Sequence, residues 1–130
     1  MNPKLFLLFN HQITVDQEAD ARKSLGVASM IEPPERIKDA WKRVPPNPPS
    51  IESCLEPVKS WLSEEAGPGD YLLVQGDFGA TWLMVRFAFE LGLIPVYSTT
   101  ERLVKEERSS DGVVNATHTF RHRIFRQYGR

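Results

Sequence analysis

The chain is poor in the residues that cross-link small proteins. It has one cysteine, Cys54, and three histidines among 130 residues. A single cysteine cannot form an internal disulfide, and no Cys/His set has the spacing of a zinc site. We therefore expect a protein of the reducing cytoplasm, without a metal or another cofactor, whose core is large enough to fold without such cross-links.

Long apolar runs and a strong net charge are also lacking. No segment approaches the roughly 20 apolar residues of a membrane span, and the start of the chain lacks the cleavage site of a signal peptide. The formal net charge of −1 argues against binding to long nucleic acids, which requires a basic surface. A small polyanion remains possible, because residues 121–130 hold four arginines and no acid.

The chain does contain apolar runs that alternate with helical patterns. At this length the pattern predicts one domain, residues 1–130. Its order predicts an α/β fold of the Rossmann-like kind, a mainly parallel sheet flanked by helices. The expected strands are 4–9, 27–31, 71–75 and 93–97, and the expected helices are 14–25, 35–44, 50–62 and 79–91.

Several side chains mark where these helices begin and what they bury. Thr14 and Gln17 have the spacing of a capping box. Ser50 is the expected cap of the third helix, and Pro57 marks the start of its regular part. The three tryptophans lie on helical stripes and are predicted to be core residues: Trp41, Trp61 and Trp82.

The C-terminal part of the chain predicts an antiparallel hairpin that extends the sheet toward a partner subunit. The segments 102–108 and 113–126 flank Ser109-Ser110-Asp111-Gly112, and Asp-Gly is a favoured hairpin turn. His118, His122 and Arg126 fall on one face of the last strand. Such residues most often form a polar sheet face, although they are also able to face a ligand.

The segment Gln75-Gly76-Asp77-Phe78-Gly79-Ala80 joins a predicted strand to a helix, so its backbone N–H groups form a candidate phosphate site. A tight connection with Asp77 as helix cap explains it equally well. It matches neither the dinucleotide fingerprint nor the Walker sequence. Phe78 either stacks on a base or anchors the loop in the core, and the anchor is the favoured interpretation.

Two more polar clusters follow predicted strands, and parallel sheets bind ligands at the carboxyl ends of their strands. The first holds Asn10, His11 and Gln12, and a histidine side chain titrates close to neutral pH. The second is the segment 98–102, in which Ser98, Thr99, Thr100 and Arg102 offer hydroxyls and a cation for phosphate oxygens. Structural roles explain both clusters as well, and no catalytic triad is recognisable in the sequence.

Taken together and in order, many segments resemble one small stand-alone CRISPR-associated family, similar to the ring nucleases of type III systems that have a CRISPR-associated Rossmann fold (CARF). The resemblance covers nearly the whole chain. It is carried by Leu8–Thr14, Asp20-Ala21, Leu25-Gly26-Val27, Trp41, Pro45-Pro46, Gly69-Asp70, Val74–Ala80, Pro95–Thr100, Phe120-Arg121-His122 and Phe125–Gly129.

The resemblance implies a homodimer that binds a cyclic oligoadenylate, above all cyclic tetra-adenylate, and cleaves it without a metal. A ribose 2′-hydroxyl would attack the adjacent phosphorus and leave a 2′,3′-cyclic phosphate. His11 would act as acid or base, and Arg102 would stabilise charge. The implied ligand-binding residues are Asn10, Gln12, Gln75, Gly76, Asp77, Phe78, Gly79, Ser98, Thr99 and Thr100. A non-catalytic binder of the same ligand and an interaction subunit without a small ligand are the alternatives.

Overall fold

A computed structural model describes residues 2–130 and contains a five-stranded mixed sheet in the order β2-β1-β3-β4-β5. The strands β2, β1, β3 and β4 run parallel to one another, and β5 is antiparallel to β4. The strands are β1 (Lys4–Leu8), β2 (Ser29–Ile31), β3 (Tyr71–Val74), β4 (Ile94–Arg108) and β5 (Val114–Gln127). The α/β class, the mainly parallel sheet and the C-terminal antiparallel hairpin expected from the sequence are therefore confirmed.

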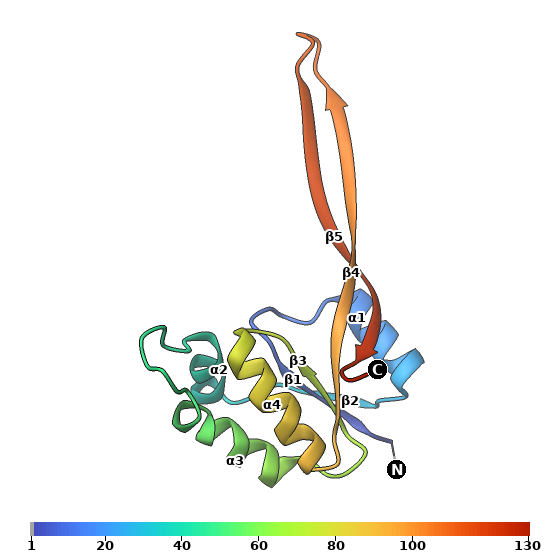
Figure 1. Cartoon of the computed structure of the whole chain (residues 1–130). Coiled ribbons are helices and arrows are strands. Elements are labelled where there is room, and N and C mark those ends of the chain that lie inside the picture. Colours follow the sequence, from blue (N-terminus) through green and yellow to red (C-terminus); the bar gives the residue numbers. More distant parts are fainter. Residues whose placement is uncertain (1) are drawn as a thin grey trace.

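Helices cover both faces of the parallel part of the sheet (Figure 1). α2 (Glu35–Lys42), α3 (Glu56–Glu65) and α4 (Phe78–Glu90) lie on one face, and α1 (Val15–Asp20) lies on the other. α1 continues into the π-helical turn Ala21–Leu25. β1 and β3 are apolar without alternation because both of their faces are buried.

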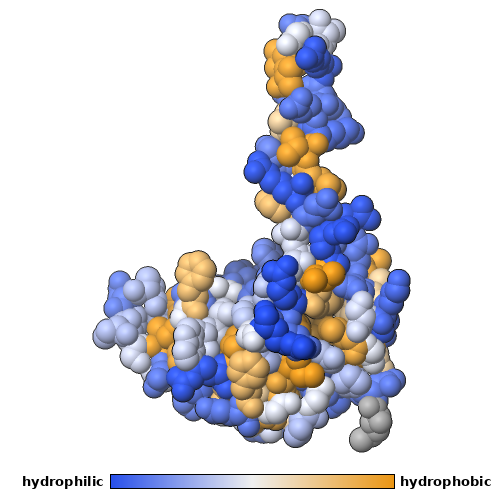
Figure 2. Space-filling model, turned by 45° about the vertical axis from the view of Figure 1, so that its right-hand side comes forward, coloured by the Kyte–Doolittle hydropathy of each residue, from blue (hydrophilic) through white to orange (hydrophobic). Residues whose placement is uncertain are grey.

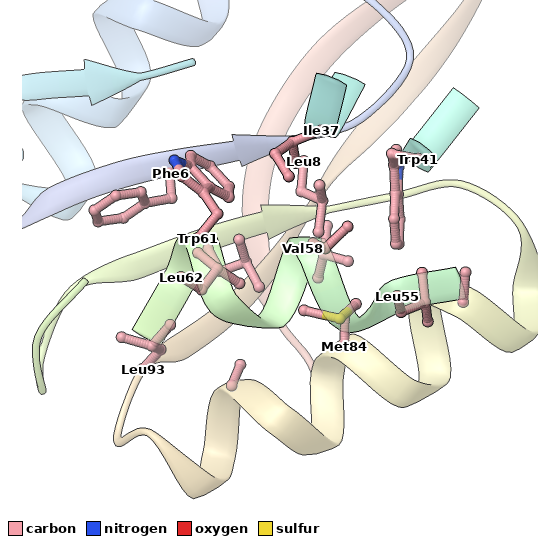
Figure 3. Packing of buried hydrophobic residues seen from close by; sticks show 14 residues of the cluster. Phe6, Leu8, Ile37, Trp41, Leu55, Val58, Trp61, Leu62, Met84 and Leu93 are labelled. Atoms are coloured by element: carbon pink, nitrogen blue, oxygen red, sulfur yellow. The ribbon is translucent and has the colours of Figure 1, made fainter. Parts of the chain in front are cut away.

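Side chains of β1 alternate between two cores. Phe6 and Leu8 pack with Trp41 and Trp61 of α2 and α3, as Figure 3 shows. The other core holds Leu5, Leu7, Ala21, Val27, Leu73 and Val96. Trp41 is 2% exposed and Trp61 is 5% exposed, so both are core residues as predicted.

The third tryptophan, Trp82, was predicted to lie in the core, and this prediction is wrong. Trp82 is 56% exposed on α4 and lies under the guanidinium of Arg86, whose Cζ is 4.7 Å from the ring centroid. α4 buries Ala80, Met84 and Ala88 toward the sheet, and Trp82 faces away from that stripe. Helical spacing alone does not tell which stripe of an apolar helix faces the core.

The predicted helix starts have different outcomes. Thr14 and Gln17 form the expected capping box, in which each side chain binds the backbone N–H of the other residue. Ser50 does not cap the third helix, which is a correction. A 3₁₀ turn, Ser53–Leu55, precedes α3, and the α-helix begins at Glu56 with Pro57 in its first turn. A proline fits there because the first helical N–H groups have no intrahelical acceptor.

The hairpin extends far from the rest of the molecule (Figure 1). The sequence predicted separate strands at 93–97 and 102–108, but the structure has one continuous strand, β4. Its register against β5 shifts between Ser98 and Thr100, the position of a β-bulge. We call residues 101–121 the arm, because every one of them is exposed.

The surface of the arm mixes polar and apolar side chains along its length (Figure 2). Leu103, Val104, Val113, Val114 and Phe120 are its exposed apolar residues. In the part of the chain that the structure describes, no helix combines the length and the apolar character required to cross a membrane.

Candidate functional site

A cleft of about 500 Å³ lies at the carboxyl edge of the parallel strands, where the base of the hairpin meets the body. Five residues singled out from the sequence line it together: His11, Gln12, Gln75, Ser98 and Thr100. Phe9, Thr14, Gln17 and Phe120 complete the lining. The loops after β1 and β3 lie here beside Ser98 and Thr100 of β4, at the edge where parallel sheets bind ligands.

Two glutamine side chains have fixed orientations in this cleft. Oε1 of Gln17 accepts the Thr14 N–H at 2.9 Å, so its amide nitrogen is the atom that donates to Oγ of Ser98, at 3.3 Å. Oε1 of Gln75 accepts the Ser98 N–H at 2.8 Å. The Gln75 NH₂ group therefore remains a donor for a ligand.

Ser98 is the first member of a hydrogen-bonded chain. Its Oγ lies 2.5 Å from Nδ1 of His122, and Nε2 of His122 lies 2.7 Å from Oδ2 of Asp20. The side chains of His122 and Asp20 are 4% and 19% exposed. No triad was recognised from the sequence, yet the structure brings a serine, a histidine and an aspartate into line. They come from β4, β5 and the end of α1.

Asp20 is the anionic end of this chain. Its burial opposes ionisation, but the hydrogen bonds from Ser24 and His122 and the charges of His122 and Lys23 outweigh that effect and lower the pKa of Asp20. Ser24 donates from Oγ to Oδ1 of Asp20 at 2.5 Å. The carboxylate accepts from Nε2 of His122, and in the neutral form of the imidazole Nδ1 is then the nitrogen that accepts from Ser98.

A second hollow, of about 230 Å³, lies on the other side of the loop after β1. Phe9, His11 and Gln12 line both hollows, and Asn10 lines only this second one. Its charged residues are three acids, Glu32, Glu35 and Asp39, and two cations of α2. Lys38 is paired with Glu32 and Glu35, whereas Lys42 forms no ion pair with the described residues. The two hollows share Phe9, His11 and Gln12, and together they form a face of mixed polar and apolar side chains from Lys42 to Ser98.

The turn Gln75–Ala80 contributes to the cleft only through Gln75. At Gly76, an added Cβ would lie 2.7 Å from Nε1 of Trp41, which donates to the Gln75 carbonyl at 2.9 Å. This glycine thus serves the packing of Trp41. The Asp77 side chain accepts the Ala80 N–H at 3.0 Å and caps α4, so a carboxylate already occupies that helix N-terminus.

Phe78 does not anchor the turn in the core, contrary to the favoured interpretation. It is 95% exposed and lines an apolar hollow of about 400 Å³ with Trp82, Val85 and Phe89. Gly79 lies in the first turn of α4, where an added Cβ would meet only ordinary contacts. Phe78 and Gly79 do not line the cleft.

Two residues of the segment 98–102 also lie away from the cleft. Thr99 Oγ1 bonds the backbone of Ile124, accepting its N–H at 3.1 Å. Arg102 is in the arm, where its Nη2 lies 2.8 Å from Nδ1 of His118. Arg126 is exposed and donates to the hydroxyl of Tyr97 at 3.0 Å. Neighbours in a strand alternate between faces, which separates Thr99 from Ser98 and Thr100.

The sequence did not point to Asp20, Gln17, Phe120 or Lys42 as site residues, and for His122 it left a polar sheet face or a ligand contact open. The hairpin register could not be read from the turn. A two-residue turn at Asp111-Gly112 would place Arg123 opposite Thr100, whereas the ladder begins at Arg108 and Val114 and places His122 there.

The structure defines an α/β protein that has a mainly parallel sheet, a hairpin arm and, at their junction, a cleft lined by polar and aromatic side chains. The chain belongs to the MJ1673 family, since the family model described as "Uncharacterized protein MJ1673 family" matches residues 3–126. It is 46% identical over 126 residues to the uncharacterized protein MJ1673 of Methanocaldococcus jannaschii, covering 97% of each chain. No solved structure matches it.

Proposed function

We propose that the protein is a ring nuclease with a CARF-like Rossmann fold, which cleaves a cyclic oligoadenylate, above all cyclic tetra-adenylate, and so ends type III CRISPR signalling. The supporting observation is the face from Lys42 to Ser98, which crosses the carboxyl edge of the sheet. It offers the Lys42 cation, amide donors and hydroxyls over a wide area, between the aromatic side chains of the cleft and the carboxylates of Glu32, Glu35 and Asp39 in the second hollow. A ring of four nucleotides needs such a set of contacts rather than one deep pocket.

The proposed chemistry is attack of a ribose 2′-hydroxyl on the adjacent phosphorus, with departure of the 5′-oxygen. His11 lies at the rim shared by the two hollows, where it is able to exchange a proton with a linkage that crosses from one to the other. Lys42 and the Gln75 NH₂ group would stabilise charge on phosphate oxygens. Arg102, in the arm, would contribute only to a ligand or subunit that reaches the arm.

The proposed assembly is a homodimer that binds the ring across its two-fold axis, because identical subunits supply evenly spaced identical contacts. The arm supports this proposal. An isolated two-stranded ribbon is only marginally stable in water, and this one exposes apolar side chains such as Leu103, Val104 and Phe120. A second subunit would cover them.

Incubation of the purified protein with cyclic tetra-adenylate in EDTA tests the proposal. We expect linear products that end in a 2′,3′-cyclic phosphate, resolved by chromatography and mass spectrometry. A His11→Ala variant should bind the ring and cleave it at least roughly 100-fold more slowly. Lys42→Ala should weaken binding, whereas Lys59→Ala is its matched control, because Lys59 lies on α3 and lines neither hollow.

Other outcomes point to other functions. Binding of the intact ring without cleavage would indicate the non-catalytic sensor or sponge. If no cyclic oligoadenylate of any ring size binds, the proposal is wrong and an interaction subunit becomes the better hypothesis.

A further inference from the structure

Ser98 is the member of the Asp20–His122–Ser98 chain that lines the cleft. His122 and Asp20 lie behind it and instead line a shallow hollow with Lys23, Arg121 and Arg123. We propose that Ser98 is a nucleophilic serine, activated by His122 and Asp20, which attacks the carbonyl carbon of an ester bound in the cleft. This inference is independent of the proposed cleavage of cyclic oligoadenylate.

The geometry meets the two requirements for an activated serine. The nucleophile and its base must be within hydrogen-bond reach, and a third group must orient the base. Ser98 Oγ and His122 Nδ1 are 2.5 Å apart, and Asp20 holds the other ring nitrogen at 2.7 Å. Serine proteases use the two ring nitrogens in the opposite order. The reversal leaves the chemistry intact, because neutral imidazole always has one donor and one acceptor nitrogen.

Packing holds the histidine in place. The His122 ring lies 4.5 Å from the ring of Phe125, centroid to centroid, and its side chain is almost fully buried. His122 pairs with Thr100, and the β-bulge begins directly beyond this pair, before Ser98 pairs with Phe125. Bulges redirect side chains next to active sites. In this protein the shift in strand register occurs where Ser98 Oγ reaches Nδ1 of His122.

Neutral donors surround Ser98. The Gln17 amide donates to Ser98 Oγ itself, and the Gln75 NH₂ group is a donor that would suit the oxyanion of a tetrahedral intermediate. No lysine or arginine is among the residues that line this cleft. An uncharged carboxylic ester fits the lining beside Ser98, because Lys42, the cation of the proposed phosphodiester site, lines the other hollow.

The step balances without a co-reactant. Ser98 Oγ forms a bond to the carbonyl carbon while its proton passes to His122 Nδ1. The tetrahedral intermediate then expels the alcohol, which takes that proton from His122. Water, activated by the same imidazole, attacks the acyl-serine and releases the carboxylic acid, which restores Ser98.

A fluorophosphonate probe tests the nucleophile directly, because it modifies activated serines with loss of fluoride. We expect mass spectrometry of the intact folded protein and of its peptides to find the adduct on Ser98. His122→Gln should slow the modification by roughly 100-fold or more, as expected for loss of a general base. Ser109 is the internal control, since it also bonds an aspartate, Asp111, but no histidine. Thermal melting shows which variants are folded.

Asp20→Asn is the second variant, and it decides the question if His122→Gln does not fold. It should also slow the modification, because an amide no longer fixes the tautomer. p-Nitrophenyl acetate and bis(p-nitrophenyl) phosphate then separate the two ester classes, and we expect release of nitrophenol from the acetate only.

Three results would overturn the proposal. These are an unmodified Ser98 in the folded wild-type protein, a rate in the folded variants equal to that of the wild type, and modification of Ser109 at the rate of Ser98. Hydrolysis of the phosphodiester in place of the acetate would refute the assigned substrate class.

Discussion

The body of the molecule and its arm are built on different physical principles. In the body, β1 and β3 bury side chains on both faces, and residues such as Leu5, Leu8 and Leu72 are 0% exposed. In the arm, residues 101–121 are all exposed, and the ladder between β4 and β5 is the regular structure that holds them. The body is therefore specified by burial, whereas the arm is specified by its turn and its strand pairing.

The candidate site lies where these two regions meet. Ser98, Phe120 and His122 belong to the hairpin near its base, whereas Asp20 and Gln75 belong to the body. The hairpin supplies the Ser98 hydroxyl and the His122 imidazole, and the body positions them through hydrogen bonds with Gln75 and Asp20. Predictions that perturb the two regions separately test this division.

The largest effect should come from the core tryptophan. Trp41→Ala should lower the free energy of unfolding by roughly 3–5 kcal/mol, through lost burial and a cavity. It also removes the donor to the Gln75 carbonyl. Trp82→Ala is the matched control, because Trp82 is half exposed, and it should cost far less. Urea denaturation measures both variants, and equal losses would contradict the assignment of Trp41 to the core and Trp82 to the surface.

The next effect concerns the turn after β3. Gly76→Ala should destabilise the body by about 1–3 kcal/mol, the range for an overpacked site, because the new methyl group would overlap the Trp41 indole. Gly79→Ala is the control. It lies in the first turn of α4 with only ordinary contacts, so alanine should be neutral or stabilising there. If both substitutions are tolerated equally, Gly76 is not required by packing.

These two glycines show what the sequence alone did and did not predict. The strand–turn–helix pattern correctly placed Gly76 in the turn after a strand and Gly79 at the start of the following helix. It did not distinguish a glycine needed for packing from one that is not, because Trp41 is 35 positions earlier in the chain. The Asp20–His122 contact was equally out of reach, since it joins residues 102 positions apart. Local patterns predicted the elements, whereas packing between distant elements determined the site.

A smaller, pH-dependent effect is expected at the junction. Because the folded state lowers the pKa of Asp20, this group stabilises the fold above the usual carboxyl value of 3.8, and the contribution disappears as the pH falls through its folded pKa. Asp20→Asn should therefore cost on the order of 1 kcal/mol at neutral pH, as for loss of charged hydrogen bonds. The difference from the wild type should shrink below pH 3.8. A difference that is constant with pH would contradict this account.

The smallest effect on the body should come from the arm itself. Replacing residues 103–119 by Asn-Gly joins Arg102 to Phe120, which are paired in the ladder, through a favoured two-residue turn. Because the deleted residues are exposed, the free energy of unfolding of the monomer should change by no more than about 0.5 kcal/mol. The cleft should remain, since Ser98, Thr100, Phe120 and His122 are retained. Sedimentation should show a monomer, if the arm holds the proposed dimer together. A large loss of monomer stability would show instead that the arm supports the body, and the two regions would not be independent.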